Sequence, residues 1–180
     1  QPIGALMDHA AATAAVEAAR AKDPSASLME LSVFGSLNGA AFDLTGSRIV
    51  SSSTSGGTVV VWDAGTQQPA AEITHIQVID ALFDPRGDRI MTWSAFGQVY
   101  FWDARTGKRM GRGIKHPGVL RGAAFADEGR KVLTWGSDRS VRLWNADTQE
   151  PIGEPMKHEN VVDGALLMED DHRLMSWGAD

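Results

Sequence analysis

The chain has 180 residues and no cysteine, which excludes disulfide bonds and thiolate metal sites. Its net charge of −6 argues against nucleic acid as a partner, and no apolar run reaches the roughly 18 residues that a membrane-crossing helix requires. With 43% hydrophobic residues the chain can bury a core. No signal peptide opens the sequence, and the absence of cysteine suits a reducing cytosol, so we expect a cytoplasmic protein. From its charge and its lack of a membrane-crossing run we expect it to contact neither nucleic acid nor membrane.

The first 37 residues divide into two parts. Residues 1–9, "QPIGALMDH", match residues 150–158, "EPIGEPMKH", at their Pro, Gly, Met and His positions. They are therefore predicted to be the last strand of a preceding repeat, so that the sequence starts inside a repeat. Residues 10–37 are an insertion, whose Ala-rich segment Ala10–Lys22 predicts a short helix. A tolerated loop insertion is favoured over a lid or docking element.

From residue 38 onward the sequence repeats with a period of about 41 residues. Three markers keep this period: the apolar end of a Gly-Ala-Ala-Phe-like block, a Trp followed by Asp or Asn, and a His that closes the unit. In chain order the markers are Phe42, Trp62 and His75; Phe83, Trp102 and His116; Phe125, Trp144 and His158; and Leu167. The predicted units are residues 38–75, 76–116 and 117–158, with the start of a fourth at 159–180.

Each unit is predicted to hold four short strands. The first carries the Gly-Ala-Ala-Phe block and is followed by a turn, clearest at Asp84–Gly87, where Pro sets φ and Gly accepts a positive φ. The second strand carries a Ser or Thr, the third ends at the marker Trp, and the fourth ends at the His. Val59–Trp62 is apolar without alternation, which is typical of a strand covered on both faces. A unit of this size achieves that only by stacking against its neighbours.

These features resemble those of WD-repeat β-propellers, in particular prokaryotic members. The resemblance implies an all-β fold, a partial propeller of about four blades taken from a ring of about seven blades, to which the Ala-rich segment adds a short helical insertion. It also implies a non-catalytic scaffold or sensor for protein partners, within a larger multidomain protein. Two alternatives stay open. One is a fragment that self-associates through exposed blade edges; the other is an enzyme with a central-channel active site, for which Asp80 is the one ionisable residue in the first-strand blocks.

The resemblance further implies a hydrogen-bonded chain in each blade, from the Trp through a Ser or Thr to a His and an Asp, which satisfies buried polar groups. The third repeat contains all four residues, namely His116, Thr134, Asp138 and Trp144. The second contains His75, Thr92 and Trp102, with Phe96 in the position of the Asp. The first contains Ser51 and Trp62, with Gly56 at the Asp position, and the fourth contains His158, Ser176 and Asp180.

A hydroxyl, a His and an Asp in one unit are also the components of a catalytic triad. Because the group recurs from repeat to repeat, we interpret it as structural and predict no catalytic residue. The closing His residues are separated by a full repeat each, which is too far to share one metal ion. We therefore expect neither a metal site nor a cofactor.

Partner-binding residues are expected in the loops at one end of the strands, which the resemblance implies is the usual recognition face. The candidates are Gln77, Phe96, Arg139 and Asn160. Phe96 is the strongest, as an aromatic residue in a turn that the family gives to Asp, although packing of its ring against a neighbouring repeat is the favoured interpretation. The second-strand tryptophans are expected to pack between repeats rather than to anchor a partner. They are Trp93, Trp135 and Trp177.

Overall fold

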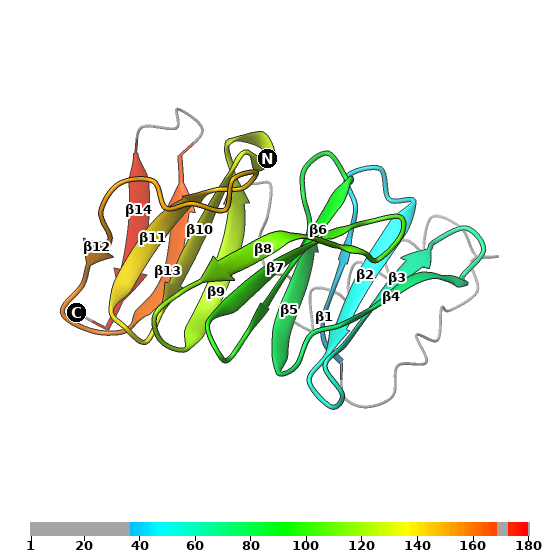
Figure 1. Ribbon diagram of the computed structural model, residues 1–180, viewed down its shortest axis with the longest axis horizontal. Coiled ribbons are helices and arrows are strands. Elements are labelled where there is room, and N and C mark those ends of the chain that lie inside the picture. Colours follow the sequence, from blue (N-terminus) through cyan, green and yellow to red (C-terminus); the bar gives the residue numbers. More distant parts are fainter. Residues whose placement is uncertain (1–36, 169–172, 180) are drawn as a thin grey trace, which may run out of the picture.

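The computed structural model of the chain describes residues 37–168 and 173–179. These residues form an all-β fold of four antiparallel sheets (Figure 1). The helical structure that they contain is limited to one short 3-10 turn. The helix predicted within residues 10–37 and the strand predicted at residues 1–9 lie outside the described residues.

Within each sheet the strands are paired in chain order. The first sheet consists of β1 (Leu37–Phe42), β2 (Arg48–Ser53), β3 (Thr58–Asp63) and β4 (Pro69–Thr74). The second consists of β5 (Val78–Phe83), β6 (Arg89–Ser94), β7 (Gln98–Asp103) and β8 (Arg109–Lys115). The third consists of β9 (Leu120–Ala126), the 3-10 turn η1 (Asp127–Gly129), β10 (Lys131–Gly136), β11 (Ser140–Asn145) and β12 (Met156–Lys157). The fourth consists of β13 (Val162–Leu167) and β14 (Leu174–Gly178).

The four sheets stack side by side in chain order (Figure 1). β5 packs against β1 and β2, β9 packs against β6, and β13 packs against β9 and β10. The first strand of each sheet therefore contacts the preceding sheet, and the hydrophobic core lies between sheets. The core between the second and third sheets includes Met91, Trp93, Val99, Phe101, Leu120, Ala123 and Val132.

The third strands occupy the interior of this stack. Val59 and Val61 are fully buried, and Val60 and Trp62 are each 7% exposed. This confirms the prediction that β3 is covered on both faces. Successive side chains of a strand point to opposite faces, so burial of the whole run requires apolar neighbours on both sides of the sheet.

An arginine at the start of the second strand ties neighbouring sheets together, and the sequence analysis missed it. Arg48 Nε lies 3.0 Å from a carboxylate oxygen of Asp43 in its own turn. Its Nη2 donates to the carbonyl of Gly87, in the corresponding turn of the second sheet, at 2.6 Å. Arg89 makes the equivalent contacts from the second sheet to the third. The signal was present in the sequence as an Asp and an Arg at fixed positions in two successive repeats.

A second contact between sheets depends on Gln149, which is 6% exposed. The pairing of β8 with β7 is interrupted between Val99 and Phe101, and this leaves backbone groups of β8 without partners in the sheet. Gln149 Oε1 accepts from the Gly113 amide at 2.6 Å, and its Nε2 donates to the Met110 carbonyl at 3.0 Å. A side chain of the third sheet thus satisfies the bulged edge of the second.

Replacing Gln149 with alanine is expected to lower the free energy of unfolding by about 1–2 kcal/mol, because both backbone groups of β8 lose their partner. Chemical denaturation with fluorescence detection measures this difference. Gln149→Asn is the control for backbone strain, since Asn accepts the positive φ of 61° more readily than Ala does, while its side chain is one methylene too short to keep both contacts with β8. A loss that is present in the alanine variant and absent in the asparagine variant would assign the effect to the strained backbone rather than to the contact with β8.

Candidate functional site

The third sheet contains a continuous hydrogen-bonded chain of four side chains. Trp144 on β11 donates from Nε1 to Thr134 Oγ1 on β10 at 2.8 Å. The same hydroxyl lies 2.8 Å from Nδ1 of His116, which follows β8. His116 Nε2 lies 2.9 Å from Oδ1 of Asp138, in the turn between β10 and β11. Thr134 and His116 are fully buried, so the hydroxyl is closed to a substrate.

The direction of these hydrogen bonds follows from their chemistry. An indole N–H can only donate, so Thr134 accepts from Trp144 and its own proton is free for His116 Nδ1. Burial lowers the pKa of His116, and the Asp138 carboxylate offsets only part of this effect. The neutral imidazole therefore carries its proton on Nε2 and donates it to Asp138. Burial alone would raise the pKa of Asp138, but hydrogen bonds from Ser140 and His116 hold it below its ordinary value.

The second sheet has the same chain with its last member missing. Trp102 Nε1 donates to Thr92 Oγ1 at 2.9 Å, and Thr92 lies 2.7 Å from His75 Nδ1. His75 Nε2 is buried and has no hydrogen-bond partner, because Phe96 stands where the third sheet has Asp138. Burial, together with the charge of Arg109, lowers the pKa of His75 to about 4. The second sheet therefore contains a neutral, buried and unsatisfied imidazole.

The first and fourth sheets contain shorter forms of the chain. Trp62 Nε1 donates to Ser51 Oγ at 2.9 Å. In the fourth sheet His158 contacts Ser176 Oγ at 2.8 Å through Nε2 rather than Nδ1. Asp180 lies outside the described residues. Gly56, at the predicted Asp position of the first sheet, is exposed in the turn after β2.

The structure places the four predicted partner-binding residues in two pairs. Gln77 lies beside the turn that carries Phe96, because the Ala95 amide donates to its carbonyl at 3.1 Å. Arg139 lies beside the loop of Asn160, since the His158 amide donates to the Arg139 carbonyl at 2.9 Å. All four side chains are exposed. One pair belongs to the second sheet, and the other links the third sheet to the fourth.

The favoured prediction for Phe96, that its ring packs against a neighbouring repeat, is wrong. The ring is 55% exposed. A Cβ on Gly97 would lie 2.3 Å from the His116 carbonyl oxygen and 2.5 Å from that of Gly118. The backbone of this turn is thus pressed against the loop after β8, which leaves no room beneath the turn for an aromatic ring.

Phe96 in this turn and two apolar residues in the loops beside it, Ile76 and Val119, are exposed. We call these three residues the loop-end surface. The exposed fractions of Ile76, Phe96 and Val119 are 69%, 55% and 50%. Phe96 lies between the other two, because its turn contacts the loop after β4 on one side and the loop after β8 on the other. The sequence analysis missed Val119, since its repeat position holds no aromatic or charged residue that would single it out.

The second-strand tryptophans differ in their surroundings. Trp93 and Trp135 are 1% and 4% exposed, as expected for packing between sheets. Trp135 Nε1 donates to the Asp163 carbonyl of the fourth sheet at 3.1 Å, whereas Trp93 Nε1 has no partner. Trp177 is 49% exposed, so the prediction that it packs between repeats is wrong within the described residues. No described strand pairs with the outer edge of β14.

Asp80, on which the enzyme alternative depended, is hydrogen-bonded to neighbouring groups of the first and second sheets. Its Oδ1 accepts from Ser52 Oγ at 3.1 Å and from the Ala81 amide at 2.8 Å. Burial raises the pKa of Asp80. Ser52 holds the repeat position that is Trp in the other sheets, and Gly39 leaves space for the carboxylate, because a Cβ there would lie 2.3 Å from Asp80 Oδ1. The carboxylate thus helps to join the first and second sheets.

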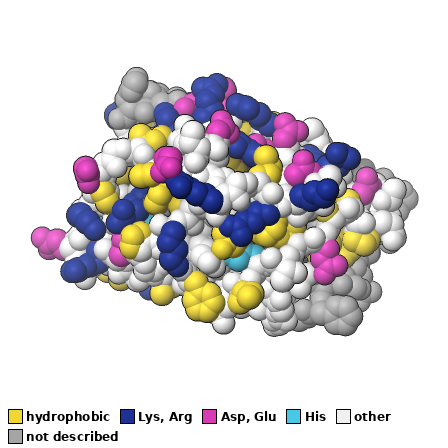
Figure 2. Space-filling model, in the orientation of Figure 1, with side chains coloured by type: hydrophobic (Ala, Val, Ile, Leu, Met, Phe, Trp, Pro, Cys, Tyr) yellow, Lys and Arg dark blue, Asp and Glu magenta, His cyan; other side chains and the backbone are white. Residues whose placement is uncertain are grey.

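The basic residues Arg109, Arg112 and Lys115 of β8 each contact a different neighbouring group. Figure 2 shows Lys and Arg side chains spread over one face of the molecule among acidic and apolar ones. The Arg109 guanidinium carbon lies 3.7 Å from the centroid of the Tyr100 ring. Arg112 forms an ion pair with Glu150, and Lys115 donates to a backbone carbonyl in the β6–β7 turn. These contacts distribute the cations along the strand instead of gathering them around one anion site.

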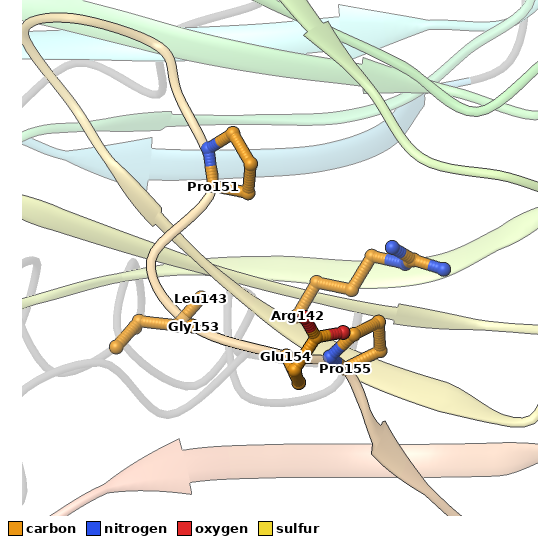
Figure 3. A pocket seen from close by; sticks show the side chains of 6 residues that line it. All are labelled: Arg142, Leu143, Pro151, Gly153, Glu154 and Pro155. Carbon is orange, nitrogen blue, oxygen red and sulfur yellow. The ribbon is translucent and has the colours of Figure 1, made fainter.

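Two hollows lie on the third and fourth sheets. The first is lined by Arg142, Leu143, Pro151, Gly153, Glu154 and Pro155 (Figure 3). Its volume is about 10 Å³, room for about one water molecule, so it is too small for a ligand. The second is wide and open, and it is lined by His158, Glu159, Ser176, Trp177 and Gly178. It lies beside the unpaired edge of β14.

The sequence matches no protein-family model and no curated protein. In the parts of the chain that the structure describes, no helix has the length and apolarity that a bilayer crossing needs. Across residues 37–168 and 173–179, no group of three or more His, Cys, Asp or Glu could hold a metal ion. The candidate site is therefore interpreted from its own geometry.

Replacing Phe96 with aspartate is expected to raise the free energy of unfolding at neutral pH by about 1–2 kcal/mol, because the new carboxylate gives His75 Nε2 its missing acceptor. The pKa of His75 should also rise. In the wild type its folded value of about 4 lies below the ordinary 6.5, so stability is lost as pH falls from 6.5 toward 4. That loss should be smaller in the variant. Denaturation at neutral pH and at about pH 5 measures both effects.

Phe96→Ser controls for removal of the exposed ring. If the aspartate variant is no more stable than the serine variant, the carboxylate does not reach His75, and the repeat correspondence between Phe96 and Asp138 does not extend to side-chain geometry.

Proposed function

We propose that this chain is a non-catalytic protein-binding module, built as a section of a WD-repeat β-propeller. Three four-stranded sheets with the same strand order, and a fourth sheet of two described strands stacked beside them, support the proposed fold. The complete hydrogen-bonded chain of the third sheet supports it independently, since the resemblance implies that group of side chains. In this arrangement each described sheet is one blade or part of one.

The loop-end surface is the observation that carries the proposed function. Its three apolar side chains are exposed, and the loops that carry them contact one another through their backbones. A grouped apolar surface of this kind marks an interaction site. The polar side chains beneath it, such as Thr92 and Thr134, are fully buried and committed to the hydrogen-bonded chains. The surface therefore offers contact area rather than reactive groups.

A photo-crosslinking experiment tests this function. A benzophenone amino acid placed at position 96, in cells that produce the protein, is expected to form covalent adducts with one or a few defined proteins. The same amino acid at Leu44, which is 75% exposed in the turn between β1 and β2, is the matched control at the other end of the strands. Equal adduct patterns from both positions, or none from position 96, would contradict the proposal.

Self-association is the second candidate, and the open edge of β14 favours it. Met175 and Trp177 on this strand are 51% and 49% exposed, and unpaired edges with apolar side chains recruit further strands. Sedimentation equilibrium distinguishes the two candidates. A monomer at micromolar concentration would reject self-association and leave the loop-end surface as the binding site.

A further inference from the structure

The backbone of the turn that carries Phe96 is fixed by contacts with the neighbouring loop, and the ring is exposed. The turn is held from below, where the Gly97 backbone meets the His116 and Gly118 carbonyls. It is also held from the side, where Lys115 donates to the Phe96 carbonyl. A ring on a fixed turn keeps its position without a partner, so little ordering is needed when a partner binds.

The presence of Phe96 leaves a defect beneath it. In the third sheet, Asp138 accepts the proton of His116 Nε2 at 2.9 Å. In the second sheet the same repeat position is Phe96, and His75 Nε2 is left buried without a partner. A buried polar atom without a hydrogen-bond partner is costly, and a single Asp at position 96 would supply one. Such a defect is expected where the residue that causes it has a function.

The charges around the ring indicate what it binds. The loops that carry Ile76, Phe96 and Val119, with the last residue of β8, contain one cation, Lys115, and no carboxylate. This local excess of positive charge contrasts with the net charge of −6 for the whole chain. Lys115 uses one of its N–H groups on the Phe96 carbonyl and has two more to offer. Arg139 adds a second exposed cation in the next turn.

The loops beside Lys115 contain no carboxylate, whereas Asp138 and Glu159 lie next to Arg139. The Asp138 carboxylate accepts hydrogen bonds from His116, Ser140 and Arg142, so it is paired with donors of the third sheet. Glu159, in the loop after β12, is a direct neighbour of Arg139, whose Nη1 donates to the Glu159 backbone carbonyl at 3.3 Å. The apolar surface is therefore bordered by positive charge on the side of Lys115.

We propose that the loop-end surface binds an acidic segment of a protein partner, with a large apolar side chain of that segment seated on Phe96 and its carboxylates on Lys115 and Arg139. This inference rests on the proposed function and adds the chemistry of the partner to it. Apolar contact supplies most of the affinity, while the cations select for acidic flanking residues and speed association.

A displayed library of random peptides tests the inference on the full chain. Peptides selected on the wild type are expected to be enriched in Asp and Glu around a Phe, Leu, Ile or Trp. The enrichment should disappear on Phe96→Ser and persist on Leu44→Ser. Phe96 is exposed, so its variant is expected to fold, and a thermal unfolding curve verifies this.

Charge reversal tests the electrostatic contribution to affinity, and the salt dependence of binding separates this contribution from the loss of the Lys115 contact with the Phe96 carbonyl. For the selected peptides, Lys115→Glu is expected to weaken binding about fivefold, and adding Arg139→Glu to weaken it about tenfold or more. Lys108→Glu makes the same change in net charge at the far end of β8 and should leave affinity within about twofold at moderate salt. The affinity of the wild type should fall as salt is raised.

Each of the remaining outcomes contradicts either the acidic chemistry of the partner or the whole inference. Enrichment of neutral or basic peptides that still depends on Phe96 would overturn the acidic partner and leave the proposed function standing. Enrichment independent of Phe96, or no enrichment, would overturn the inference altogether, while crosslinking at position 96 would then decide the proposed function separately. A dimer that dissociates in Phe96→Ser would show that a second copy of this chain occupies the surface.

Discussion

Replacing Arg89 with leucine is expected to lower the free energy of unfolding by about 3–5 kcal/mol. Arg89 Nε lies 3.1 Å from Asp84, whose side chain is 1% exposed. Its Nη2 donates to the Gly129 carbonyl of the third sheet at 2.7 Å, and its Nη1 lies 2.7 Å from Asp147. Leucine would leave a buried carboxylate without its counter-charge and a buried carbonyl without its donor, and it would remove a link between two sheets.

Two further variants separate these causes. Arg48→Leu removes the equivalent link from the first sheet, but the Arg48 side chain is 29% exposed, and the repeat position that corresponds to Asp147 is Arg105. Its loss is expected to be smaller, about 2 kcal/mol. Adding Asp84→Asn to Arg89→Leu removes the unpaired charge and should recover part of the lost stability, as measured by urea denaturation. If Arg48→Leu cost as much as Arg89→Leu, burial of the ion pair would not be the cause.

The extent to which sequence predicted structure depends on where each contact lies. The chain of Trp144, Thr134, His116 and Asp138 is formed by residues that follow one another within one period, so their repetition along the sequence marks them as a group. The contact of Arg89 with Gly129 joins two successive repeats. A comparison of repeats shows which positions correspond, but it does not show which neighbour a side chain reaches, and that contact was missed.

The two wrong predictions have a common cause. Phe96 and Trp177 were both expected to pack against a neighbouring repeat, because large aromatic side chains gain free energy by burial. Burial requires free space on the neighbour. Beneath Phe96 that space is filled by the backbone of the loop after β8, and beyond Trp177 no described sheet is present. The identity of a residue sets what it gains by burial, whereas its neighbours decide whether burial occurs.

Replacing Thr134 with valine is expected to cost about 3–4 kcal/mol of unfolding free energy, because one hydroxyl serves two buried groups. Trp144 Nε1 would lose its acceptor and His116 Nδ1 would lose its donor. Moving the His116 proton to Nδ1 would not compensate, because valine offers no acceptor there and Asp138 would lose its donor on Nε2. Valine fills nearly the same volume, so the expected loss reports polar satisfaction and not a cavity.

Two matched variants make this prediction specific. Thr134→Ser keeps the hydroxyl and should retain most of the stability, with a small loss from the missing methyl group. Ser51→Ala removes the one partner that the structure gives to Trp62 Nε1, at 2.9 Å, so it should cost about 1–2 kcal/mol, roughly half as much. Amide exchange across β10 and β11 should accelerate in Thr134→Val and not in Thr134→Ser. Equal losses for Thr134→Val and Ser51→Ala would mean that the bond to His116 adds nothing, and that the chain of four side chains does not act as one unit.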